Sequence, residues 1–170
     1  VLGFDTGPGM CLIDECVNKF WSDQYDKNGK YSIDANINQS MLDSLINDTA
    51  FIMQAPPKST GREEFGLEFI DRVIEKYNAL SRFEILRTLV KFTSISIKLN
   101  INKFISNKFK VDQLVISGGG AFHPVLINDM KKDLDIPILN IIDYGIELNF
   151  KESLLMSVLG YAKIKNIKSN

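Results

Sequence analysis

The chain has 170 residues, of which 45% are hydrophobic and 24% are charged, a composition typical of a folded globular protein. Its formal net charge is −1, with 20 basic and 21 acidic residues, so nucleic acid and anionic membranes are not indicated as partners. No apolar run approaches the roughly 18 residues that span a bilayer. Residues 1–5 show no feature of a signal peptide. We therefore expect neither membrane insertion nor nucleic-acid binding.

The first predicted elements are a strand, a glycine turn and a helix. Residues 1–4 form a short apolar run that leads into the glycine turn of residues 5–9. Apolar residues at helical spacing then predict a helix over residues 10–20. Cys11 and Cys16 are five positions apart, which is poor spacing for a shared metal or a local disulfide, and we expect two reduced thiols.

The middle of the chain carries clear helix-start signals. Asn38 is expected to cap one helix. The two prolines of residues 55–57 force extended backbone, and a helix follows over residues 61–77. Ser81 and Glu84, three residues apart, predict a capping box at the start of a long helix.

The last third alternates between strands and helices. A strand rich in β-branched residues is predicted at 111–116, and it leads into the three glycines of residues 118–120. A helix is predicted from Pro124, a second apolar strand at 138–142, and a final helix capped by Asn149. This alternation predicts an α/β fold with parallel pairing.

Only three strands are predicted, which is few for a free-standing sheet. The chain also lacks an initiator Met and opens directly on a predicted strand. We therefore expect further strands before Val1 and regard the chain as part of a longer protein.

The glycine turn after the strand at 111–116 is the strongest candidate site. Without Cβ atoms, Gly118, Gly119 and Gly120 allow a flat ligand to approach, and the next helix offers free N–H groups. Ligands of open α/β sheets bind beyond the carboxyl ends of the strands, where this turn lies. The alternative is a tight turn that only requires positive φ. Three glycines in a row favour a ligand, so cofactor binding is predicted at these glycines and at Ala121.

The first glycine turn has the same order of strand, turn and helix. We predict that Asp5, Thr6, Gly7 and Gly9 contact nucleotide phosphate or a sugar hydroxyl. Asp5 is also a candidate substrate ligand and a candidate Mg²⁺ ligand, directly or through water. In the alternative, Asp5 and Thr6 only satisfy the backbone of their own turn.

Three further positions leave two interpretations open. The loop of residues 56–63 is either an anion site or a capping box of Thr60 and Glu63. Glu152 either binds substrate or takes part in capping with Asn149. His123 follows the glycine turn and is expected to begin a helix, because no Ser, Cys or acidic partner for it is evident from the sequence.

Five motifs, taken in order, resemble the C-terminal half of the anhydro-N-acetylmuramic acid kinase family. They lie at residues 3–9, 25–29, 56–63, 118–121 and 151–152. Any one of them is modestly specific, whereas the run from Pro57 to Arg62 and the ordered set are highly specific. The resemblance extends from Val1 to the last predicted helix.

The resemblance implies an α/β fold of the ribonuclease H-like, actin-like ATPase type, with a mixed sheet and helices packed around it. Residues 1–170 would be the single C-terminal lobe of a two-lobe sugar kinase. That kinase would use ATP and Mg²⁺ to open and phosphorylate 1,6-anhydro-N-acetylmuramic acid, giving N-acetylmuramic acid 6-phosphate in peptidoglycan recycling. Gly118–Gly120 would bind adenosine, and Asp5–Gly9 would line the cleft beside phosphates and sugar. A cytoplasmic homodimer is implied as well.

Met10 and His123 depart from the family pattern, which usually has Asn at both positions. The resemblance also implies that the N-terminal phosphate loop and the aspartate base precede Val1. Because phosphoryl transfer depends on positioning, charge stabilisation and a base that activates the nucleophile, we expect no catalytic residue in this chain and no turnover by it alone.

The sequence leaves three alternative functions open. The chain is the nucleotide-binding half of the kinase, or an isolated lobe that binds nucleotide without turnover, or a lobe retained for dimerisation. The alternative family assignment is another ATPase of the same fold, because glycine turns alone do not determine the substrate.

Overall fold

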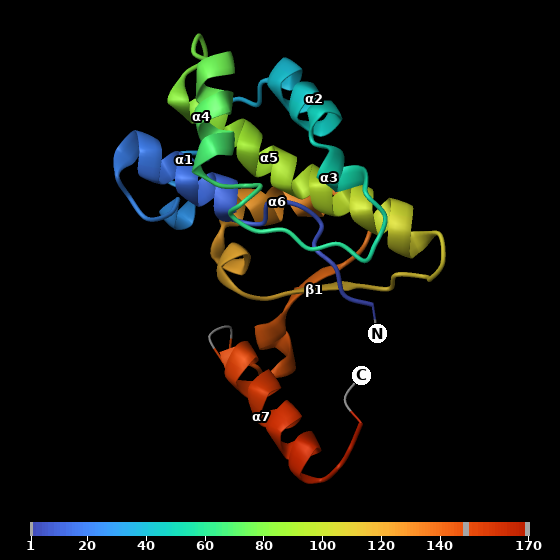
Figure 1. Cartoon of the computed structure of the whole chain (residues 1–170). Coiled ribbons are helices and arrows are strands. Elements are labelled where there is room, and N and C mark those ends of the chain that lie inside the picture. The colour runs from blue at the N-terminus through green and yellow to red at the C-terminus, as the bar shows by residue number, and fades with distance from the viewer. Residues whose placement is uncertain (1, 148–149, 169–170) are drawn as a thin grey trace.

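The computed structural model describes residues 2–147 and 150–168, which are mostly helical. The helices and strands are α1 (Cys11–Trp21), α2 (Gln39–Asp48), α3 (Ala50–Met53), α4 (Leu67–Lys76), α5 (Arg82–Asn100), β1 (Leu114–Ile116), α6 (Pro124–Asp133), β2 (Ile138–Asn140) and α7 (Lys151–Ile164). Short helical turns are η1 (Lys27–Gly29), η2 (Ile101–Ser106), η3 (Gly119–Phe122) and η4 (Ile141–Tyr144). Figure 1 shows α1–α6 gathered in one body and α7 extending below the strands.

Helix α5 runs through the middle of this body and contacts α1, α2, α3 and α6. It begins with the predicted capping box, in which the Ser81 hydroxyl accepts from the Glu84 amide and the Glu84 carboxylate accepts from the Ser81 amide. Leu86, Leu89 and Phe92 are fully buried along it. Because its neighbours cover several sides of it, α5 organises the core.

Two other local predictions are confirmed. The Asn38 side chain accepts a hydrogen bond from the Met41 amide and caps α2. Both cysteines are free, with Cys16 buried and Cys11 partly exposed. Within the described part of the chain, no helix is long and apolar enough to cross a membrane.

The sheet is smaller than predicted. β1 and β2 pair in parallel, with Leu114 beside Ile138 and Ile116 beside Asn140, and they are the whole sheet of the described residues. The strand predicted at residues 1–4 is wrong for residues 2–4, and Val1 lies outside the described residues. This segment runs toward the loop before α4 instead, where the Asp5 amide donates to a carbonyl. The predicted mixed sheet is thus corrected to two parallel strands in a largely helical chain, and the lobe type stays a prediction.

The helix predicted over residues 61–77 begins later, at Leu67. Its N-cap is Gly66. Only glycine fits at this position, because the turn before the helix brings the Arg62 carbonyl oxygen within 2.1 Å of where a Cβ would lie. The capping box of Thr60 and Glu63 is therefore wrong. The predicted cap at Asn149 lies outside the described residues.

Candidate functional site

The three glycines after β1 differ in what they contribute to the turn. Gly118 has φ 79° and ψ −172°, a region of backbone conformation that is essentially restricted to glycine. A Cβ on Gly119 would meet no atom within 4 Å, whereas one on Gly120 would lie 3.4 Å from the sulfur of Met10. The first glycine therefore permits the turn, the second leaves open space, and the third lies at ordinary contact distance from Met10.

Two cavities meet at this turn. The larger, of about 540 Å³, is lined by Gly119 and by residues of the segment 24–28. The smaller, of about 410 Å³, is lined by Gly120 and Ala121 and, from the first glycine turn, by Thr6 and Gly9. Met10 lines both cavities. The structure therefore brings together the two glycine turns that the sequence indicates as ligand-binding.

A buried pair of side chains shapes the larger cavity. His123 Nε2 lies 3.2 Å from Asp26 Oδ2, while His123 Nδ1 accepts from the Leu126 amide at 3.1 Å. Because Nδ1 is an acceptor, Nε2 carries the N–H and donates a hydrogen bond to the Asp26 carboxylate. His123 thus begins α6, as predicted, and also ties the segment 24–28 to the glycine turn.

Asp26 receives two more hydrogen bonds, from the Ser32 hydroxyl at 2.6 Å and the Tyr31 amide at 2.8 Å. Burial by itself raises the pKa of Asp26, but its three hydrogen bonds outweigh that effect and hold the pKa below its usual value. Asp26 is therefore ionised at neutral pH and acts as an anchor. This partner of His123 is not evident from the sequence, since it lies 97 residues earlier.

Asp14 of α1 places a second carboxylate at the larger cavity. Its Oδ1 is buried and has no hydrogen-bond partner among the described residues. Burial raises the pKa of Asp14 to about 6, although the positive charge of Arg62 and the proximity of His123 act in the opposite direction. An unpaired acceptor beside a cavity is costly unless a ligand or water donates to it. No sequence pattern singles out this residue, since the spacing of its helix indicates only amphipathic packing.

The raised pKa predicts that Asp14→Asn changes stability in a pH-dependent way. The carboxyl has a pKa of about 6 in the folded chain, against an ordinary value of 3.8. The folded state therefore binds the proton more tightly, and the free energy of unfolding falls as pH rises from 4 through 6. After allowing for partial exposure, Asp14→Asn should raise the free energy of unfolding by about 1–2 kcal/mol above pH 6 and leave it unchanged below pH 4. Urea unfolding from about pH 4 to pH 8 checks this, and a pH-independent difference would contradict it.

The loop of residues 56–63 holds the Asp5 carboxylate. Asp5 Oδ2 accepts from the Ser59 hydroxyl at 3.0 Å and from the Thr60 amide at 2.9 Å. Within the described residues, no hydrogen bond reaches Asp5 Oδ1, and Asp5 is exposed. The loop therefore orients one carboxylate oxygen and leaves the other available to a ligand.

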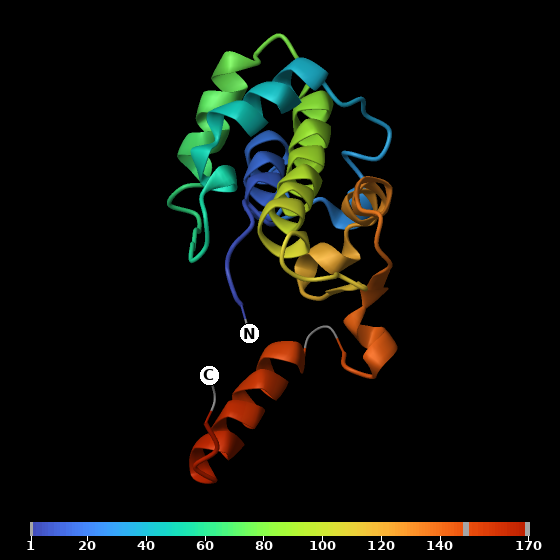
Figure 2. The ribbon, with the colours of Figure 1, turned by 90° about the vertical axis from the view of Figure 1, so that its right-hand side faces the viewer.

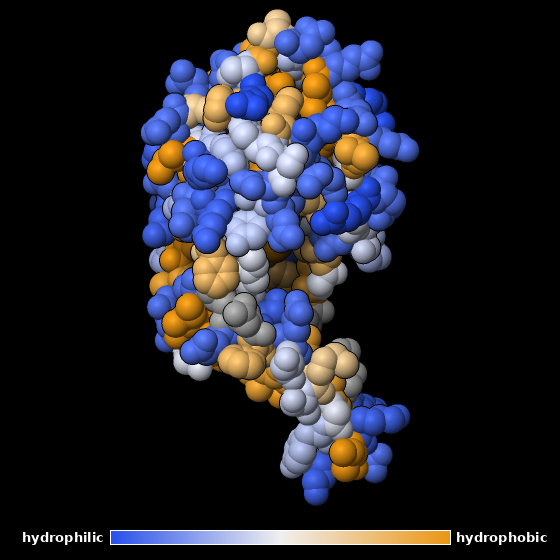
Figure 3. All heavy atoms as spheres, turned by 90° about the vertical axis from the view of Figure 1, so that its left-hand side faces the viewer, coloured by the Kyte–Doolittle hydropathy of each residue, from blue (hydrophilic) through white to orange (hydrophobic). Residues whose placement is uncertain are grey.

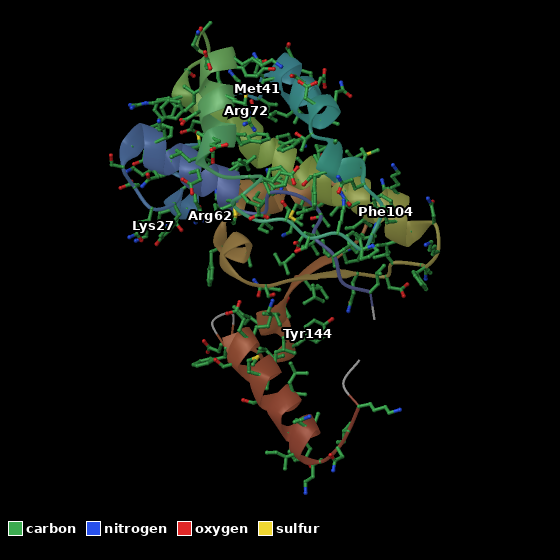
Figure 4. All side chains as sticks on the ribbon, viewed as in Figure 1. Lys27, Met41, Arg62, Arg72, Phe104 and Tyr144 are labelled. Carbon is green, nitrogen blue, oxygen red and sulfur yellow. The ribbon has the colours of Figure 1, made fainter. Side chains whose placement is uncertain are left out.

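The two cations of this loop contact protein groups instead of forming an anion site. Lys58 is buried, and its Nζ donates to the Phe51 and Ile52 carbonyls, both at 3.0 Å. Arg62, which Figure 4 shows beside α1, pairs with Glu15 of that helix. The loop thus joins α1 and α3 to the first glycine turn.

Four predicted site residues line neither cavity, namely Asp5, Gly7, Gly118 and Glu152. A Cβ on Gly7 would lie 2.7 Å from Ser96 Oγ, so this glycine permits close packing on α5. Glu152 is exposed on α7, which Figures 1 and 2 show apart from the body that holds both cavities. The described residues include no cluster of three His, Cys, Asp or Glu that could hold a metal ion.

The profile described as "AnmK: Anhydro-N-acetylmuramic acid kinase" matches residues 1–170. The chain belongs to the anhydro-N-acetylmuramic acid kinase family. It is 38% identical over 171 residues to the anhydro-N-acetylmuramic acid kinase of Clostridioides difficile (strain 630), covering 100% of this chain and 44% of that protein. The kinase of Francisella tularensis subsp. novicida is 35% identical over 170 residues, with the same coverage. This chain of the anhydro-N-acetylmuramic acid kinase family therefore spans less than half the length of these relatives. The resemblance to the family is confirmed, and the assignment to its C-terminal half stays a prediction.

Proposed function

We propose that this chain supplies the nucleotide-binding half of a kinase that uses ATP to hydrolyse and phosphorylate 1,6-anhydro-N-acetylmuramic acid. The product would be N-acetylmuramic acid 6-phosphate, formed in the cytoplasm during cell-wall recycling. Family membership supports the sugar and the kinase activity. The main support for a nucleotide site is Gly119, where an added Cβ would meet no atom within 4 Å. This glycine lines the larger cavity beyond the carboxyl end of β1. In this proposal, residues 1–170 are the C-terminal, actin-like lobe of a homodimeric two-lobe enzyme.

The nucleotide would lie across the glycine turn. The larger cavity suits adenosine, because the exposed rings of Tyr25 and Phe122 line it together with Gly119. The unpaired oxygen of Asp14 would accept from an amino or hydroxyl group of the ligand. The smaller cavity, lined by Thr6 in the first glycine turn, would face the phosphates.

Asp5 would act beside the phosphates through its free carboxylate oxygen. Mg²⁺ is commonly held by one or two carboxylates together with phosphate oxygens and water, so a single carboxylate fits this ion. When bound, Mg²⁺ neutralises charge on the transferred phosphoryl group. The base that activates water is proposed to come from the half outside this chain. The alternative is that Asp5 itself is this base, since its second carboxylate oxygen accepts no hydrogen bond from the described residues.

Gly119→Val tests the nucleotide site in a complete kinase that carries this chain. The added side chain has room in the fold but occupies space beside the turn, so ATP affinity should fall at least about tenfold, or roughly 1.4 kcal/mol, with the melting temperature nearly unchanged. Gly118→Ala should instead cost about 1–3 kcal/mol of stability, because of its backbone conformation.

Gly3→Val is the matched control, since a Cβ there also meets no atom within 4 Å and Gly3 lines neither cavity. It should leave ATP affinity unchanged. Calorimetric titration with ATP measures the affinity of Gly119→Val and of its control, and melting curves measure the stability of all three variants. A folded Gly119→Val protein that binds ATP as tightly as the unmodified kinase would rule out the proposed site.

A further inference from the structure

Helix α7 exposes apolar side chains around most of its circumference. Met156 is 66% exposed and Ile164 is 79% exposed. The other exposed apolar side chains are Leu154, Leu155, Val158, Leu159 and Tyr161. Figures 1, 2 and 3 show this helix protruding from the body. A helix that is apolar on all sides is normally buried, so α7 has the surface of a core helix without a core around it.

This helix is also too short to be stable by itself. It has 14 residues, and among the described residues no side chain caps its N-terminal end at Phe150. Isolated helices below roughly 12–15 residues are marginal in water, and most helical stability in proteins comes from tertiary packing. Within the described part of α7, Ala162 is the one buried residue. The fold therefore requires a covering partner for α7.

The end of the body nearest α7 is uncovered as well. Val115 in the middle of β1 is 39% exposed, although parallel strands are usually covered on both faces. Ile142 and Tyr144 in η4 are also exposed, and Figure 4 shows Tyr144 between the sheet and α7. A sheet of two strands is below the number that is independently stable. The sheet, η4 and α7 thus each expose apolar side chains at the same end of the molecule.

We propose that α7, η4 and the exposed face of β1 form a docking surface for the part of a family kinase that lies outside this chain. The inference rests on the proposed function, in which the chain works with another half. This chain covers 44% of its relatives, so more than half of their length is left to supply the cover. A second copy of the chain would bury α7 but bring only another two-stranded sheet, whereas the remainder of a longer kinase can add strands and helices.

Hydrogen exchange of the amides in residues 151–164 tests this surface without any substrate. In the complete kinase, exchange of these amides should be at least about 100-fold slower than in this chain alone, because local opening would require undocking. Equal exchange rates would overturn the proposal. Slow exchange in the chain alone that depends on protein concentration would also overturn it, since a second copy would then be the cover.

A matched pair of variants makes the test specific. Leu155→Glu places a charge on the exposed apolar side of α7 and should return fast exchange to residues 151–164 of the complete kinase. Ser153→Glu replaces an exposed polar residue of the same helix and should keep exchange slow. Equal exchange rates of residues 151–164 in the two variants would contradict the proposed docking surface. Because exchange is measured without nucleotide, a failure to bind ATP would reject the proposed function and leave this result intact.

Discussion

Asp5→Asn in a complete kinase that carries this chain is expected to lower kcat/KM for sugar phosphorylation at least about 100-fold, because the proposed Mg²⁺ ligand, and with it charge stabilisation of the transferred phosphoryl group, would be lost. The fold should remain intact, because Asn keeps an oxygen that accepts from Ser59 and Thr60, and because Asp5 is exposed. Steady-state kinetics with ATP and 1,6-anhydro-N-acetylmuramic acid, together with a melting curve, measure both parts of the prediction.

The Mg²⁺ dependence of this variant separates two roles for Asp5. If Asp5 holds the metal, higher Mg²⁺ concentrations should recover part of the activity. If it acts as the base, kcat should stay low at every Mg²⁺ concentration. Asp34→Asn is the control, because Asp34 is also exposed but, unlike Asp5, is not adjacent in the chain to a residue that lines either cavity. Activity of Asp5→Asn within about threefold of the control would exclude Asp5 from the chemistry.

The second large effect is on stability. Arg87 of α5 and Asp129 of α6 form a bidentate ion pair, with N–O distances of 2.6 and 2.8 Å. Their side chains are only 11% and 3% exposed. Asp129→Ala would leave the guanidinium buried without a partner, and we expect it to lower the free energy of unfolding by about 3–5 kcal/mol. Urea unfolding of the chain measures this loss.

A surface pair provides the control for Asp129→Ala. Lys110 and Asp112 also form an ion pair, but their side chains are 87% and 73% exposed. Asp112→Ala should therefore cost less than about 1 kcal/mol. If Asp129→Ala lowers the free energy of unfolding by less than about 1 kcal/mol, the expected role of the buried pair is contradicted. Because α6 starts directly after the glycine turn, the pair fixes the turn relative to α5.

The sequence predicts best where the signal is local. The capping box of Ser81 and Glu84, the cap at Asn38 and the helix start at Pro124 each depend on residues within a few positions of one another. The three glycines after β1 predict a ligand turn for the same reason, and the structure places Gly119 and Gly120 at cavities. The order of motifs along the chain is enough to predict the family.

Long-range pairing explains what the sequence does not show. The contact between His123 and Asp26 joins residues 97 positions apart, and no local pattern marks it. A strand at residues 2–4 requires a neighbouring strand, and the adjacent Asp5 amide donates to the Lys58 carbonyl of a loop instead. The cations of the loop at 56–63 suggest an anion site, yet the Lys58 ammonium satisfies two backbone carbonyls. In each case the sequence shows the chemistry of a side chain but not the partner that the fold brings to it.

Photolabelling of the complete kinase with an azido analogue of ATP tests the central claim most directly. Mass spectrometry of the labelled peptides should find the label in this chain, in residues 24–28 or 117–123, which line the larger cavity or lie beside it. An excess of ATP should abolish this labelling, and Gly119→Val should reduce it. ATP-competed label found only outside this chain would contradict the assignment of the nucleotide-binding half to it.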